Sequence, residues 1–149
     1  MQLRYLPQKG INSDLFLPPE VEVPEGSHRV IGFNFPGLAA LGTNNAQESV
    51  RDGDFVAYAL VATVVSAATA TGFGLMLYHS HKGVQRQLWE QVVHGNNVCG
   101  TAANPAYLPS PYLFAQGDII TCEISNISKT ATTYKTADIY ISLWGVLPE

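Results

Sequence analysis

The chain has 149 residues, a length that fits one domain, and only 13% of them are charged. Its formal net charge of -4 argues against a nucleic-acid-binding protein, because such a protein would carry a basic patch. Two cysteines are too few for a disulfide scaffold, and no apolar run near the start of the chain resembles a signal peptide. These features favour synthesis and assembly in a reducing cytoplasm.

Residues 1–24 are expected to form an extended N-terminal arm. Its apolar clusters are separated by Pro7 and Gly10, and the pair Pro18-Pro19 disfavours a helix. Because a proline-punctuated arm has little reason to fold on its own, we expect its apolar side chains to dock on another subunit. The interface candidates are Leu3, Tyr5, Leu15, Phe16 and Leu17. Residues 25–149 are expected to form a single domain.

Strand patterns begin at the end of the arm and recur at fairly regular intervals. They lie near residues 21–23, 29–35, 54–65, 73–80, 86–94, 119–125 and 137–145, with loops expected at 38–45 and 96–110. Gly, Pro and Asn turns separate them, and helical periodicity is almost absent. This organisation predicts an all-β, antiparallel sandwich.

The segment from Phe55 to His81 contains no Asp, Glu, Lys or Arg, and it is long enough to span a bilayer. Its β-branched residues and the small-residue stretch 66–72 instead favour two strands joined by a turn, so no membrane partner is expected. The next stretch, 84–93, has apolar residues at helical spacing but also fits a strand. We favour the strand, because a Lys82-Gly83 turn would pair it with 73–79 as a hairpin.

His79 and His81 are the clearest chemical candidates. Histidines at positions i and i+2 of a strand point to the same face and can chelate zinc or iron. The pair resembles that of the cupins, jelly-roll proteins in which a nearby Glu and a later His complete the site. Here the next acid, Glu90, comes too late for that spacing, and His94 is the only later histidine. The favoured interpretation is a solvated pair at a strand end, with no metal and no cofactor.

No catalytic residue is predicted from the rest of the chain. Ser80 and His81 are neighbours on a strand and therefore point to opposite faces. Cys99 has no cationic neighbour in the sequence that would lower its pKa. The aspartates Asp52, Asp54, Asp118 and Asp138 all sit at turns or strand ends, where acids usually cap and solubilise. The protein is therefore expected not to be an enzyme.

The last third of the chain carries a resemblance to a known family. It reads Pro109-Ser-Pro-Tyr-Leu-Phe-Ala-Gln-Gly-Asp118, then Ile119-Ile-Thr-Cys-Glu-Ile-Ser-Asn126, and later Ala137-Asp-Ile-Tyr-Ile-Ser-Leu-Trp-Gly145. Together with the segment from Gly53 to Leu108, this order of turns and alternating apolar residues resembles small jelly-roll structural proteins of tailed bacteriophages. Those proteins serve as cement (decoration) proteins on the capsid, or lie at the portal vertex and fibres. The resemblance covers roughly residues 50 to 147.

The resemblance implies a jelly-roll fold and a structural role in the virion. The expected protein is a capsid cement or decoration protein, assembled in the host cytoplasm and placed on the capsid exterior, where it bridges major capsid protein subunits. Low charge and the surplus of apolar residues also favour a homo-oligomer, a homodimer rather than a trimer. The alternatives are a portal, neck or fibre-base virion protein, or a cupin-like metal-binding enzyme.

Overall fold

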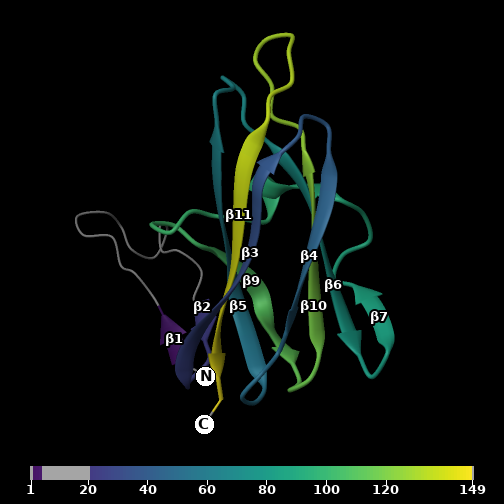
Figure 1. Cartoon of the computed structure of the whole chain (residues 1–149). Coiled ribbons are helices and arrows are strands. Elements are labelled where there is room, and N and C mark those ends of the chain that lie inside the picture. The colour runs from purple at the N-terminus through teal and green to yellow at the C-terminus, as the bar shows by residue number, and fades with distance from the viewer. Residues whose placement is uncertain (1, 5–20, 149) are drawn as a thin grey trace, which may run out of the picture.

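The computed structural model describes residues 2–4 and 21–148. These residues contain strands β1 to β11 and one short 3-10 helix, η1 (Gly95–Asn97), but no α-helix. Figure 1 shows that the main strands form two antiparallel sheets packed against each other. The all-β antiparallel sandwich predicted from the sequence is therefore confirmed. No helix in the described residues is long and apolar enough to cross a membrane.

The strand order of each sheet follows from the backbone pairing. One sheet has the order β3 (Ser27–Leu38), β11 (Ala137–Leu147), β5 (Phe55–Ser66) and β9 (Ala106–Phe114). The other has the order β4 (Thr43–Ser49), β10 (Ile119–Asn126), β6 (Phe73–His81) and β7 (Val84–Gln87), and the short β8 (Val93–His94) also pairs with β6. Strands β1 (Gln2–Arg4) and β2 (Val21–Val23) pair with each other in a separate two-stranded sheet.

The pairings are nested in the manner of a jelly roll. The first long strand of the sandwich pairs with the last (β3 with β11), the next pairs with the one before last (β4 with β10), and β5 with β9 and β6 with β7 complete the series. The pairings β11–β5 and β10–β6 then join these nested pairs into two sheets. Antiparallel strands wound in this way form a double-sheet jelly roll. The last two strands of the chain consequently lie in opposite sheets.

The core lies between the sheets and follows from the alternation of side chains along each strand. Ile120, Cys122 and Ile124 of β10 are fully buried, and they face the first sheet, where β11 contributes Ile139 and Ile141. Each such side chain stabilises the fold by roughly 1.5–3 kcal/mol relative to exposure in water. The inward residues of the central strands therefore hold the sandwich together.

Two strands of the sandwich were not expected from the sequence. Residues 43–45 were expected in a loop and no strand was expected at 46–49, yet residues 43–49 form β4, an edge strand whose side chains are polar apart from Ala46. Residues 106–110, also expected in a loop, begin β9, where Pro109 and Pro111 interrupt the pairing with β5. Proline donates no backbone hydrogen bond and is confined to edge strands such as this one. The expected loops were wrong because edge strands do not require apolar alternation.

The predicted hairpin through Lys82-Gly83 is confirmed, because His81 pairs with Val84 across that turn. Its second strand is shorter than expected and ends at Gln87. Beyond it, the side chain of Trp89 donates from Nε1 to the carbonyl oxygen of Leu75 at 3.2 Å. The expected strand 86–94 is thus confirmed only at its two ends. Residues 88–92 form no strand, and the short β8 pairs again with β6.

The expected N-terminal arm is described only in part. Leu3 lies in β1 and is opposite Glu22 of β2, so the two ends of the arm pair as antiparallel strands. The other interface candidates, Tyr5, Leu15, Phe16 and Leu17, lie outside the described residues. Strand β2 lies against β9, which places the start of the domain beside the first sheet.

Gly145 provides a direct test of the core packing. A Cβ atom at this position of β11 would lie 2.4 Å from the ring of Phe55 and 2.5 Å from the carbonyl oxygen of Val56. We expect Gly145→Ala to lower the free energy of unfolding by about 1–3 kcal/mol, because overpacking forces neighbouring atoms to move. The matched control is Gly32→Ala on β3, where a Cβ atom meets nothing within 4 Å. Chemical denaturation of both variants measures the difference, and equal stabilities would contradict the packing described here.

Candidate functional site

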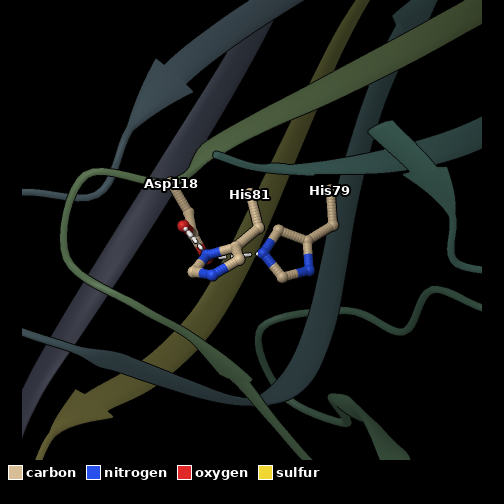
Figure 2. Close-up of side chains that lie close together, drawn as sticks. All are labelled: His79, His81 and Asp118. Atoms are coloured by element: carbon tan, nitrogen blue, oxygen red, sulfur yellow. Dashed lines mark hydrogen bonds and ion pairs between the residues drawn. The ribbon is translucent and has the colours of Figure 1, made fainter. Parts of the chain in front are cut away.

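Three polar side chains meet at the end of the sandwich where β6 ends and β10 begins. His79 and His81 belong to β6, and Asp118 directly precedes β10, the strand that pairs with β6. Because side chains alternate along a strand, both histidines point to the same side of β6 as the core residues Leu75 and Leu77. Figure 2 shows both imidazole rings lying against the carboxylate. The cluster therefore lies at the edge of the core.

Short contacts join the three side chains. His79 Nε2 lies 2.6 Å from Asp118 Oδ2, and His81 Nδ1 lies 2.6 Å from Asp118 Oδ1. The backbone N–H of Ala115 also donates to Oδ2, at 2.9 Å. Asp118 is only 3% exposed, and a buried carboxylate is costly unless its oxygens have such partners. These three donors together compensate the buried carboxylate for its lost hydration.

A tight turn before β10 fixes the position of Asp118. The Asp118 N–H donates to the carbonyl oxygen of Ala115 at 3.0 Å, and Gly117 within this turn has a φ of 91°, which glycine adopts without strain. The Asp118 carbonyl in turn accepts from the Val50 N–H at 2.8 Å, which ties the turn to the residue that follows β4. The carboxylate is therefore held by backbone contacts as well as by its side-chain partners.

The environment of Asp118 lowers its pKa. Burial by itself would raise the pKa, because it disfavours the charged form. Hydrogen bonds from His79 and His81, the backbone N–H of Ala115 and the nearby charge of His81 outweigh this effect. The pKa of Asp118 therefore lies below that of an ordinary aspartate, and the carboxylate is ionised at neutral pH.

Tyr112 of β9 extends the cluster to the opposite sheet. Its hydroxyl lies 2.9 Å from His79 Nδ1, and the His79 ring packs edge-on against Phe114 with centroids 4.7 Å apart. Burial raises the pKa of Tyr112, Asp118 adds to the rise and Arg86 opposes it, so the phenol is protonated at neutral pH. Because the Asp118 carboxylate can only accept, His79 Nε2–H donates to it. When His79 carries this single ring proton, the phenol donates to His79 Nδ1. This assignment follows from the hydrogen-bond network.

A pocket of about 410 Å³ opens in front of the cluster. Its lining residues are His79, His81, Lys82, Val84, Arg86 and Tyr112. His81 is the most exposed member of the cluster, with a side chain that is 49% accessible, whereas that of His79 is 13% accessible. The cluster is therefore accessible to small solutes from this side.

The chemistry open to this arrangement is limited by its donor atoms. The ligand atoms of His79, His81 and Asp118 lie within 4.8 Å of one another. Two imidazoles and one carboxylate form a donor set that suits divalent transition metals. Without a metal, the same atoms form a hydrogen-bonded chain from Tyr112 through His79 and Asp118 to His81.

The structure corrects two expectations about these residues. His79 and His81 were expected to be solvated at a strand end, but the His79 side chain is mostly buried and both bind Asp118. Asp118 was expected to cap and solubilise a turn, but it is a buried acceptor. The acid was sought within a few residues of His81, whereas it comes from the adjacent strand, 37 residues later. The sequence alone does not show that β6 pairs with β10, and this pairing is what brings Asp118 beside the histidines.

Other residues considered in the sequence lie outside this cluster. His94 pairs with Gly74 at the opposite end of β6, and its Nδ1 accepts from the Asn96 N–H at 3.2 Å. Burial raises the pKa of Cys99 to about 12 and also raises the pKa of Cys122 well above its usual value, so neither thiol is an activated nucleophile. Leu3 lies on β1, which pairs with β2 in the separate two-stranded sheet.

Comparison of the chain with protein-family models, with curated proteins and with solved structures found no match.

The ionisation of Asp118 predicts a pH dependence of stability. Because its pKa is lowered in the folded state, its stabilising contribution is complete above the ordinary aspartate pKa and is lost as the pH falls below about 4. Asp118→Asn should therefore be less stable than the wild type at pH 7, and the gap should narrow as the pH falls toward 3. Denaturation with a chelator present measures both proteins across this range. Glu90→Gln, which removes an exposed carboxylate away from this turn, is the control, and a gap that is independent of pH would contradict the assignment.

Proposed function

We propose that the protein is a structural subunit of a tailed-bacteriophage virion, a cement or decoration protein on the capsid exterior that bridges major capsid protein subunits. The resemblance over residues 50 to 147 motivates this role. The observation that carries it is a charge-free part of the outer face of the sheet β3–β11–β5–β9, near the start of β3 and the end of β11.

Strand pairing defines this face residue by residue. One row across the four strands contains Val30, Trp144, Ala59 and Tyr107. The adjacent row contains His28, Val146, Val56 and Leu113. We call these two rows the outer apolar face. Neither row contains Asp, Glu, Lys or Arg, whereas about a quarter of the residues in an average protein are charged.

The exposure of this face supports a docking role. Val30 is 58% exposed and Leu113 is 54% exposed, at opposite edges of the two rows. Trp144 on the central strand β11 and Tyr107 on the edge strand β9 supply aromatic side chains, which are enriched at interfaces, where charged residues are depleted. Ala59 and Val146, in the middle of the two rows, are fully buried and pack with Tyr58 in a second apolar cluster, so the exposed apolar side chains lie along the two edge strands. An exposed apolar patch is typical of a protein contact site. A capsid subunit seated here would bury it, and each fully buried aliphatic side chain would contribute roughly 1.5–3 kcal/mol.

Charge substitutions on the outer apolar face test the proposed role. Val30→Glu and Leu113→Glu should leave the fold intact, because both side chains are largely exposed. Each should weaken binding to capsid shells by at least tenfold, because the carboxylate must then be desolvated in the contact. Leu41→Glu is the matched control, since Leu41 is 62% exposed and lies in the turn between β3 and β4.

Co-sedimentation with purified shells measures this binding. Unchanged binding by both face variants would exclude the outer apolar face as the docking surface, and failure of the wild type to bind shells would reject the cement role. Sedimentation velocity on the same proteins without shells measures the proposed homodimer. Dissociation of the dimer in the face variants would assign the outer apolar face to self-association instead.

The N-terminal arm is proposed to contribute to docking rather than to folding. Deletion of residues 1–17 removes β1 and the candidates Leu3, Tyr5, Leu15, Phe16 and Leu17, but it leaves both sheets of the sandwich complete. We therefore expect a near-normal melting temperature by calorimetry and weaker co-sedimentation with shells. An unfolded truncation would assign the arm to the core, and undiminished binding would place the docking surface elsewhere.

A further inference from the structure

We propose that His79, His81 and Asp118 form a binding site for one divalent first-row transition metal ion, of which zinc is the representative. This inference is independent of the proposed virion role. It rests on the convergence of three ligand-bearing side chains, two from β6 and one from the turn before β10, as Figure 2 shows.

The geometry of the cluster is close to that of a metal site. Metal–nitrogen and metal–oxygen bonds of about 2.0–2.2 Å place neighbouring ligand atoms roughly 3 Å apart or slightly more. The two nitrogen–oxygen distances here are 2.6 Å. All three ligand atoms lie within 4.8 Å of one another. An ion would therefore be accommodated by rearrangement of these side chains, with no change in the pairing of β6 and β10.

The type of donor atom selects the class of metal. Calcium and magnesium prefer shells made of oxygen atoms, whereas imidazole nitrogen favours zinc, iron, cobalt, nickel and copper. His79 Nε2 and His81 Nδ1 supply two nitrogens, and Asp118 supplies the single carboxylate. The set therefore suits a transition metal.

The surrounding groups are arranged as metal ligands require. Metal-bound histidines usually donate their second ring N–H to a nearby acceptor, which orients the ring. The Tyr112 hydroxyl at His79 Nδ1 can accept as well as donate, so it fits His79 with or without a metal on Nε2. The backbone N–H of Ala115 donates to Asp118 Oδ2 and so orients the carboxylate. These contacts would orient two of the three ligands before a metal arrives.

Three protein ligands leave coordination positions open, and these would face the pocket lined by Tyr112, Lys82 and Arg86. Lys82 and Arg86 are exposed, so solvent screens their repulsion of a cation. The protein thus supplies a partial coordination shell, and water or a small solute from the pocket would complete it.

Titration of the full-length protein with Zn²⁺ and with Co²⁺ tests the site. We expect one ion bound per chain by calorimetry. The Co²⁺ complex should show d–d absorption without a thiolate-to-cobalt charge-transfer band, because Cys99 and Cys122 are not ligands. His81→Ala should weaken binding at least tenfold and should fold normally, because the side chain of His81 is half-exposed. Tyr112→Phe, which retains all three ligands, should weaken binding about 10–100-fold.

His28→Ala is the matched control, because His28 lies on the outer face of the first sheet and contacts Tyr58 instead of an acid. It should bind metal as the wild type does. Absence of binding by the wild type at millimolar Zn²⁺ would overturn the proposal and leave a metal-free hydrogen-bonded cluster. Binding unchanged in His81→Ala, or a thiolate charge-transfer band, would also overturn it, because the ion would then lie elsewhere.

Discussion

Alternate residues of β6 point into the space between the two sheets, and this period of two governs both the core and the candidate site. Phe73, Leu75 and Leu77 are fully buried along the inner side of the strand. His79 and His81 continue the same series where the sandwich opens at its end. The histidines are therefore directed inward because the register that buries the leucines leaves them no other face.

Burial of Asp118 is acceptable only because its partners come from elements distant in sequence. The carboxylate accepts from His79 and His81 on β6 and from the backbone of its own turn, while the turn is tied to Val50 after β4. The end of the second sheet thus depends on one ionised group. Removal of either histidine takes one hydrogen-bond donor from the carboxylate. Removal of Asp118 takes the acceptor from two imidazole N–H groups. Either change is expected to lower the stability of this end of the sandwich.

The sequence predicts the parts of this fold whose side chains alternate between apolar and polar. Strands β10 and β11 have this pattern, and the Lys82-Gly83 hairpin was predicted from its turn residues. Strand β4 has almost no apolar residues because it lies at an edge, and the prolines of β9 obscure a strand that pairs irregularly. Only the two histidines of the candidate site could be predicted from the sequence. His79 and His81 are visible in the chain, but no local pattern connects them with an acid that a nested jelly-roll pairing brings to their side.

The outer apolar face and the histidine cluster lie on surfaces that the fold keeps separate. The face is formed by outward residues of β3, β11, β5 and β9, whereas the cluster is formed by inward residues of β6 and by the turn before β10. Tyr112 belongs to β9 but points toward His79, on the side of that strand opposite Leu113. A subunit docked on the outer face would therefore not need to cover the pocket. A jelly roll can in this way carry a protein contact on one sheet and a small-ligand site at the open end of its core, each requiring different residues of the same strands.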